Sequence, residues 1–306
     1  MQTKSPLGLA VLARAFRIPF LGASILPFVF GSLLSRQALH PVIFVLGLCA
    51  VIFTHLGANL INDYADSQNT ADWKDKKFYG LFGGSKLIQE GILSESFYLF
   101  SSIVFLFLAL FSVVSLCFII KSFLPFLVFI LIALLGAGYS LPPLKFSCRQ
   151  TGEVVIFFLF GPALVMGGYF LQTGIFPSLK AFFLSVPFGL LTSAILLANE
   201  VPDYPQDKEA RKYTWVNFLQ PRRAFILYAA LAGLSVIFIV CAVAIGYLKI
   251  SALAVLLFLP MVFKATKILK VDYASKQLLL RSSALTIKFN AVVSLILIAA
   301  LFSPNP

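Results

Sequence analysis

The sequence predicts an all-α protein, a polytopic membrane bundle of about nine transmembrane helices with a polar cap on one side. Three observations support this fold class. Hydrophobic residues make up 60% of the 306 residues, charged residues make up only 12%, and the mean hydropathy is +0.96. A soluble domain carries roughly 25% charged residues. Apolar runs of about 17–25 residues, the length that crosses the hydrocarbon core, recur along the whole chain.

Nine apolar runs are long enough to be membrane spans. They cover residues 18–35, 40–62, 98–120, 123–140, 153–173, 179–200, 224–247, 249–266 and 285–302. Because no soluble domain separates them, we expect residues 1–306 to form one membrane-embedded domain. An Asn-xxx-Asp pattern follows the second span and again the sixth, four helices later. This spacing predicts two four-helix halves related by a pseudo-repeat, with the ninth helix appended.

Charge predicts the orientation of the spans. All but four of the 24 Lys and Arg residues fall on one side of a nine-span chain, and the exceptions are Arg36, Lys121, Lys180 and Lys249. The positive-inside rule places the basic side, and with it the polar cap, in the cytoplasm. The net charge of +12 suits anionic lipid head groups or a phosphate-bearing substrate. Dispersal of the basic residues among membrane loops argues against nucleic acid as a partner.

Two short stretches gather half of the acidic residues at the ends of membrane helices. The first is Asn59-Leu-Ile-Asn62-Asp63-Tyr-Ala-Asp66 with Asp72, and the second is Asn199-Glu-Val-Pro-Asp203-Tyr-Pro-Gln-Asp207. Carboxylates packed this closely repel one another unless a cation lies between them. Asp and Asn oxygens are the ligands that Mg²⁺ prefers, and Mg²⁺ commonly binds together with substrate phosphates. The two stretches therefore indicate an intramembrane enzyme that acts on a diphosphate.

Helical spacing gives each stretch a ligand face, because residues three and four apart lie on the same side of a helix. Asn62 and Asp66 have this spacing, and Asn199 has it with Asp203 and Asp207. Asp63 points away from the Asn62–Asp66 face if the helix is regular. The second stretch also contains two prolines, Pro202 and Pro205, which we expect to kink or end the helix and to line a pocket.

Two further segments carry candidate residues. Tyr139-Ser-Leu-Pro-Pro-Leu-Lys145, followed by Gly152-Glu153, closes the fourth span and opens the fifth. Beside an acidic metal site, Lys145 is a candidate phosphate ligand and Tyr139 a candidate to face a developing cation. Residues 81–94 mix apolar and polar positions, which predicts a short helix on the membrane surface. Other basic residues available to hold a diphosphate are Arg14, Arg17, Lys86, Lys208, Arg211 and Lys212.

Other functions are also compatible with parts of this pattern. A cation-coupled transporter needs intramembrane acids, but its site usually lies near the bilayer midplane, whereas these acids cluster on one side. A CDP-alcohol phosphotransferase joins its acids in one long motif that is absent here. A single acidic stretch would also fit solvated loop charges. His40 and His55 are too far apart for a zinc site, so we expect packing or interfacial roles for them.

At these residues the sequence resembles the UbiA family of intramembrane aromatic prenyltransferases, nearest the branch that prenylates 1,4-dihydroxy-2-naphthoate. Residues 62–72 are similar to the first aspartate-rich motif of the family, and Asn199, Asp203 and Asp207 with Lys212 to the second. The Gly-Gly-Ser-Lys segment at 83–86 resembles the naphthoate branch, and residues 139–153 resemble the central motif. Arg211, where a glycine is usual, and Pro205 depart from the pattern.

The resemblance implies a reaction and a set of site residues. It implies Mg²⁺-dependent transfer of a prenyl group from a polyprenyl diphosphate to an aromatic acceptor, with 1,4-dihydroxy-2-naphthoate on the menaquinone pathway as the expected acceptor and 4-hydroxybenzoate or homogentisate as alternatives. It also implies a bacterial inner membrane and a site facing the cytoplasm. The metal ligands are expected at Asn62, Asp63, Asp66, Asp72, Asn199, Asp203 and Asp207. Substrate contacts are expected from Arg17, Asn62, Lys86, Asn199, Lys208 and Lys212, and catalytic roles from Asp66, Tyr139, Lys145 and Asp203.

Overall fold

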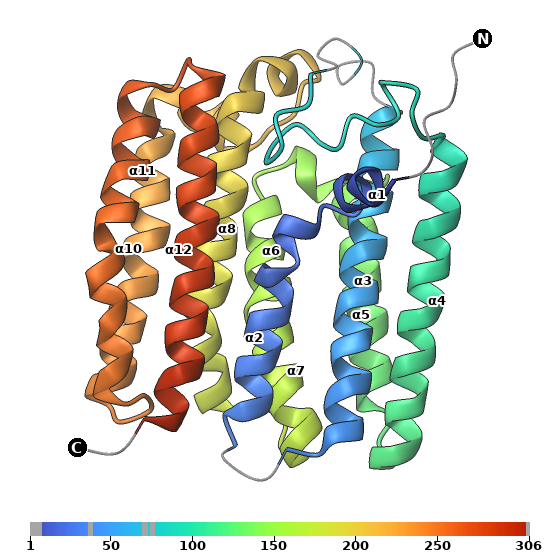
Figure 1. Cartoon of the computed structure of the whole chain (residues 1–306), viewed down its shortest axis with the longest axis vertical. Helices are drawn as coiled ribbons and strands as arrows, with labels where there is room; N and C mark the ends of the chain where they lie inside the picture. Colours follow the sequence, from blue (N-terminus) through green and yellow to red (C-terminus); the bar gives the residue numbers. More distant parts are fainter. Residues whose placement is uncertain (1–7, 36–38, 69–72, 74–76, 304–306) are drawn as a thin grey trace.

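The computed structural model describes residues 8–35, 39–68, 73 and 77–303, and this part of the chain is helical, without named strands. Its elements, in chain order, are α1 (Leu9–Ala15), η1 (Ile18–Phe20), α2 (Gly22–Leu33), α3 (Pro41–Ser67), α4 (Glu95–Ile120), α5 (Leu124–Ser140), η3 (Phe146–Cys148), α6 (Gly152–Phe160), α7 (Pro162–Thr173), α8 (Leu179–Glu209), α9 (Trp215–Leu219), α10 (Pro221–Ala244), η4 (Ile250–Phe258), α11 (Leu259–Val271) and α12 (Lys276–Phe302). The long helices lie side by side as one bundle (Figure 1).

The predicted all-α membrane bundle is confirmed, and nine spans is an approximate number. Seven helical segments of the described chain are long and apolar enough to cross a membrane. The bent pair formed by α1 and the segment Ile18–Leu33 would make an eighth, and α5, with 17 residues, is a shorter apolar helix. Together these segments account for the nine apolar runs of the sequence.

Helix α8 is the centre of the bundle. In its most apolar window 78% of the residues are buried, a larger share than in any other candidate span of the described chain. It lies between α10 and α12 on one side and α6 on the other (Figure 1), and it contributes Leu184, Phe188 and Leu191 to the largest hydrophobic cluster. Burial on all sides explains why its apolar residues show no single stripe.

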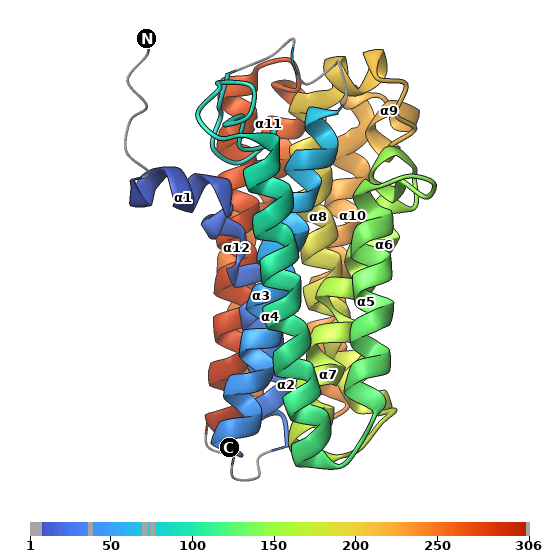
Figure 2. The same ribbon diagram turned by 90° about the vertical axis from the view of Figure 1, so that its right-hand side faces the viewer.

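One helix was not predicted: the first span is preceded by α1, which projects from the side of the bundle (Figure 2) and meets the following segment at a bend of 53°. Two expectations from the sequence are wrong in detail. Helix α8 continues through Pro202 and Pro205 to Glu209 instead of ending there. The surface helix expected at 81–94 is a series of turns, because Gly83, Gly84, Lys86 and Gly91 take the positive φ angles that interrupt a helix.

Candidate active site

A cavity of about 430 Å³ opens at the end of the bundle that carries α1 and the 77–94 segment. Ligand pockets commonly have volumes of 300–1,000 Å³. Its walls come from the start of α2, from α3, α6 and α8, and from the loop over the bundle end. The candidate residues that line it are Arg14, Arg17, Asn62, Asp66, Lys86, Tyr139, Asn199, Asp203, Asp207 and Lys212. Segments far apart in sequence therefore meet in one site.

Oxygen donors from α3 and α8 line the same cavity. The amide nitrogen of Asn62 donates to Ser140 Oγ at 3.0 Å, which leaves its carbonyl oxygen to bind a cation. Oδ1 of Asn199 is buried and has no hydrogen-bond partner among the described residues. A buried acceptor without a partner is costly, so this atom is suited to a ligand. Asp66 lies one helical turn after Asn62 on the same face of α3, and Asp203 lies one turn after Asn199 on the same face of α8.

These donors fit Mg²⁺ bound together with a phosphate. All of them are oxygens, as a hard cation requires, and the orphaned Asn199 oxygen points to a missing partner. Within the described residues, no three His, Cys, Asp or Glu side chains form a compact metal cage. Mg²⁺ usually binds through one or two carboxylates, waters and substrate phosphates and does not need such a cage.

Basic side chains surround the donors. Lys212 Nζ lies 2.8 Å from Asp207 Oδ1, and Arg17 and Lys86 line the same cavity. Burial acts to lower the pKa of Lys212, but the carboxylates of Asp66 and Asp207 outweigh it and hold that pKa well above its ordinary value. Lys212 is therefore a permanent cation beside the acids, and it can hold an anionic oxygen.

The deeper half of the cavity is apolar, with two polar side chains. His55 and Thr192 both line it. His55 precedes Asn62 on α3 by seven residues, and Thr192 precedes Asn199 on α8 by the same number. At 1.5 Å per residue, both lie about 10 Å from the asparagines along the bundle. His55 Nδ1 is hydrogen-bonded to Ser24 Oγ, whereas its buried Nε2 has no partner among the described residues.

The deep walls are otherwise hydrocarbon. The ring of Phe160 meets the His55 ring edge-on, with centroids 5.6 Å apart, and the remaining deep wall residues include Phe20, Ile156, Ile195 and Leu196. The cavity thus joins a charged end to an apolar end, which suits a ligand with an anionic head and a hydrocarbon tail.

Some predicted residues do not line this cavity. Asp63 is buried against Arg17 and does not line the cavity. Lys145 begins η3 and is also absent from the lining. Lys208 lines a second cavity, behind Lys212, with its Nζ 5.7 Å from the ring centroid of Tyr204. Asp72 lies outside the described residues.

Sequence reasoning also missed several lining residues, among them His55 and Glu200. The sequence suggested only a packing or interfacial role for His55, but His55 shares the cavity with Asn62 and Asp66. Its separation of seven residues from Asn62, two helical turns, was the available signal. Glu200 was visible as a carboxylate next to Asn199, and its buried Oε2 has no partner among the described residues.

Comparison with known proteins decides the family. The model of the UbiA prenyltransferase family matches residues 24–292. The chain belongs to the UbiA prenyltransferase family. The match includes both aspartate stretches and every transmembrane segment from α2 to α12, although α12 continues beyond it.

Curated relatives of the chain share the name "UbiA prenyltransferase domain-containing protein 1". The protein from Mus musculus is 30% identical over 79% of this chain and 70% of its own length. The protein from Dictyostelium discoideum is 30% identical over 60% of this chain and 54% of its own length. These relatives are eukaryotic and their name is not that of the naphthoate branch, so they support neither that branch nor a bacterial inner membrane.

Solved structures of UbiA family members share the fold. A UbiA homolog from Aeropyrum pernix K1 superposes with a TM-score of 0.69 at 16% identity, over 93% of this chain and 97% of that one. A UbiA homolog from Archaeoglobus fulgidus, bound to DMAPP and Mg²⁺, superposes with a TM-score of 0.60 at 19% identity, over 92% and 98%.

Proposed function

We propose that this membrane protein transfers a prenyl group from a prenyl diphosphate to an aromatic acceptor in an Mg²⁺-dependent reaction. One observation carries the proposal: the Asn-xxx-Asp sets of α3 and α8 line one cavity, together with cationic side chains that include Arg17, Lys86 and Lys212 and with hydrocarbon walls. Family membership supports it, as does the Archaeoglobus fulgidus homolog with DMAPP and Mg²⁺ bound.

The charged end is suited to hold the diphosphate. Arg17, Lys86 and Lys212 supply cationic donors for its oxygens, and Asn62, Asp66, Asn199, Asp203 and Asp207 would hold Mg²⁺. When bound, Mg²⁺ neutralises the charge that develops on the diphosphate as the bond to the prenyl carbon breaks. The fixed cations of the chain stabilise the same charge without reorganising.

The apolar end is suited to the prenyl chain and the ring. Phe20 and Phe160 line it, and hydrocarbon walls exclude the water that would otherwise trap an allylic cation. Tyr139 lines the cavity near the donors, where its ring can face that cation. Nε2 of His55 is the polar atom available to a hydroxyl of the acceptor ring.

For the acceptor we propose 1,4-dihydroxy-2-naphthoate, which makes the product a menaquinone precursor. Support comes from the Gly-Gly-Ser-Lys segment at 83–86 and from the chemistry of a ring with two hydroxyls, which is electron-rich enough to attack an allylic cation. 4-Hydroxybenzoate and homogentisate are the alternatives that the same metal chemistry would accept.

The test is a transfer assay with the purified protein in lipid nanodiscs. It contains Mg²⁺, one radiolabelled prenyl diphosphate and equal concentrations of the three acceptors, and products are separated by mass. We expect one dominant prenylated naphthoate, loss of turnover in EDTA, and losses of about 100-fold or more in Asp66→Asn and Asp203→Asn.

Two outcomes would count against parts of this proposal. Turnover that survives EDTA, or near-normal rates in both variants, contradicts the metal mechanism. Preference for a benzenoid acceptor contradicts the naphthoate assignment and leaves the prenyltransferase reaction standing.

A further inference from the structure

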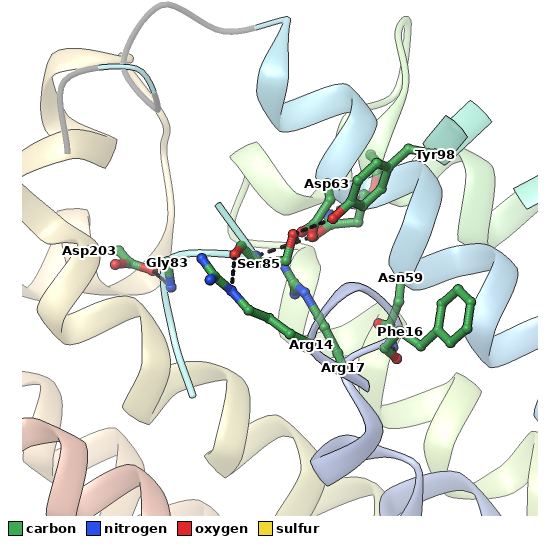
Figure 3. A network of polar contacts seen from close by, with 11 residues as sticks. Arg14, Phe16, Arg17, Asn59, Asp63, Gly83, Ser85, Tyr98 and Asp203 are labelled. Atoms are coloured by element: carbon green, nitrogen blue, oxygen red, sulfur yellow. Dashed lines mark hydrogen bonds and ion pairs between the residues drawn. The ribbon is translucent and has the colours of Figure 1, made fainter. Parts of the chain in front are cut away.

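The segment Gly-Gly-Ser-Lys at residues 83–86, called here the 83–86 loop, lies over the polar end of the cavity. Figure 3 shows it between Asp203 on one side and Arg14, Arg17 and Asp63 on the other. Ser85 is 2% exposed, and each of its polar groups is bonded. Its N–H donates to Asp63 Oδ2 at 3.1 Å, its carbonyl accepts from Arg14 Nε at 2.7 Å, and its hydroxyl lies 2.6 Å from Tyr98 Oη.

Asp63 is the hub of this arrangement. Its carboxyl group is 5% exposed, and each oxygen has its own partner. Oδ1 forms an ion pair with the Arg17 guanidinium, and Oδ2 accepts the Ser85 amide. At about 100° per residue, Asp63 lies about 100° from Asn62 and about 60° from Asp66 around α3. It is therefore at the edge of the face that these two residues present, and it does not line the cavity.

The other end of the loop contacts the second aspartate stretch. The N–H of Gly83 donates to Oδ2 of Asp203 at 3.1 Å. A hydrogen bond of this kind orients a metal-binding carboxylate while its second oxygen binds the metal. The chain of contacts from Asp63 through Ser85 and Gly83 to Asp203 therefore connects the first stretch on α3 with the second on α8.

The loop also needs glycine for this close approach. Gly84 has a φ of +76°, and a Cβ at this position would lie 3.3 Å from Arg17 Nη2 and 3.4 Å from Asp63 Oδ1. Gly83 has a φ of +75°. L-residues rarely adopt such angles, so the backbone conformation fits the Arg17–Asp63 pair and leaves little space for a side chain.

We propose that Asp63 is a positioning residue and does not bind the metal: it holds Arg17 and the 83–86 loop so that Asp203, Lys86 and Arg17 are oriented toward the diphosphate. The expected effect of Asp63 on turnover rests on the proposed function. This assignment corrects the role that the sequence pattern suggests, in which Asp63 is one more metal ligand. Its physical basis is the alignment of charged groups before substrate binds, which lowers the cost of ordering them.

The first experiment tests the anchoring without substrate. Amide hydrogen exchange is measured by mass spectrometry on the full chain in nanodiscs, for wild type and for Asp63→Asn, which keeps the shape and removes the charge. We expect exchange in residues 82–93 to accelerate by about 10-fold or more. The matched control Asp272→Asn, at the end of α11, should leave this segment unchanged.

A second variant covers the case in which Asp63→Asn does not fold. Tyr98→Phe removes only the partner of the Ser85 hydroxyl, and it should accelerate exchange in the same segment to a smaller extent. Unchanged exchange of residues 82–93 in a folded Asp63→Asn, or in Tyr98→Phe when that is the variant available, would overturn the proposal.

The second experiment separates positioning from metal binding through a double-mutant cycle. Asp63→Asn should raise KM for the prenyl diphosphate by about 10-fold. Combined with Arg17→Gln, it should raise KM by less than it does alone, because both changes break the Arg17–Asp63 contact and only the contact of Asp63 with the loop remains to be lost.

If the effects of Asp63→Asn and Arg17→Gln on KM multiply in the double variant, Asp63 acts independently of Arg17. That result would overturn the positioning role. If the wild type transfers no prenyl group at all, the proposed function fails, and hydrogen exchange alone decides whether Asp63 anchors the loop. The two failures are therefore distinguishable.

Discussion

At the scale of single residues, Lys212 is held as a cation by its surroundings. Burial favours the neutral amine, but Asp66 and Asp207 outweigh it and raise the pKa above the ordinary 10.5. A group whose pKa is higher in the folded state contributes stability at any pH below its unfolded value and loses it only as the pH rises through the folded value. Lys212 therefore keeps its charge throughout the neutral range.

We expect Lys212→Met to raise KM for the prenyl diphosphate about 10- to 100-fold, because a hydrogen bond to a charged group contributes about 1.5–3 kcal/mol. Lys212→Arg keeps the charge and should lose less. The measurement is initial-rate kinetics at saturating acceptor. Lys264→Met on α11, which does not line the cavity, is the control, and an unchanged KM in Lys212→Met would contradict a diphosphate contact. Between pH 7 and 9 the wild-type KM should show no rise from deprotonation of this lysine.

His55, unlike Lys212, has a buried polar atom that lacks a hydrogen-bond partner among the described residues. Nε2 has none among the described residues, while Nδ1 is bonded to Ser24. A buried donor or acceptor left unbonded costs about 1–3 kcal/mol. A ring hydroxyl of the acceptor would remove that cost on binding.

We expect the paired variant Ser24→Ala with His55→Leu, which removes both partners of the bond, to raise KM for the acceptor by about 10-fold or more. KM for the prenyl diphosphate should stay within about twofold, since the cations are unchanged. Ser24→Ala alone is the control for lost orientation of the ring. An equal rise in both KM values would point to a general distortion of the cavity and not to an acceptor contact.

At the scale of elements, regular helices were predictable and the connections between them were not. The spacing of Asn62 and Asp66, and of Asn199 and Asp203, follows from the helical period, and both pairs line the cavity. Pro202 and Pro205 suggested a break, yet α8 continues to Glu209, because proline removes single backbone hydrogen bonds without excluding helical angles.

The 83–86 loop could not be derived from sequence at all, because its conformation depends on partners far away in the chain. Ser85 is held by residues from α1, α3 and α4. Local propensity says nothing of such contacts. The same holds for Asp63, whose partner Arg17 is 46 residues away.

Close packing of α2 against α7 gives a prediction for this scale. A Cβ at Gly168 would lie 2.5 Å from the carbonyl oxygen of Phe28, and one at Gly31 would lie 2.2 Å from that of Val165. These backbone atoms cannot move without separating the helices, so Gly168→Ala should destabilise the protein by about 1–3 kcal/mol.

The neighbouring glycine on α7 is the matched control. Gly167 has no atom within 4 Å of its would-be Cβ, and alanine there should be neutral or stabilising by up to about 1 kcal/mol. Thermal unfolding in detergent, followed by size-exclusion chromatography, measures both. Equal stability of the two variants would show that α2 and α7 do not meet as closely as described.

At the scale of the whole molecule, apolar length was the strongest signal in the sequence. It predicted the bundle because lipid requires every spanning backbone group to be bonded within a helix. The pseudo-repeat of two four-helix halves stays a prediction. The second half of the chain carries the more buried core around α8, whereas the first half carries the cap and the α1 bend, which periodicity does not encode.

The distribution of basic residues along the whole chain also predicts how the bundle is oriented in the membrane. The cavity opens at the end of the bundle that bears the 77–94 segment and the loop after α8, and the basic residues concentrate there. By the positive-inside rule we expect this end to face the cytoplasm. Single cysteines at the exposed Gln68 and Glu209 should therefore react only with reagents admitted to the cytoplasm, in a background where the four native cysteines are replaced by serine.

Cysteines at the opposite end provide the matched controls. Lys121, which follows α4, and Ile175, between α7 and α8, are both exposed, and they should react with an impermeant maleimide in intact cells. Ser67 beside Gln68 is unsuitable for this test because it is 4% exposed. Labelling of Gln68→Cys or Glu209→Cys from outside, together with protection of Lys121→Cys, would show that the basic end faces outward and that the diphosphate must reach the site from the other side of the membrane.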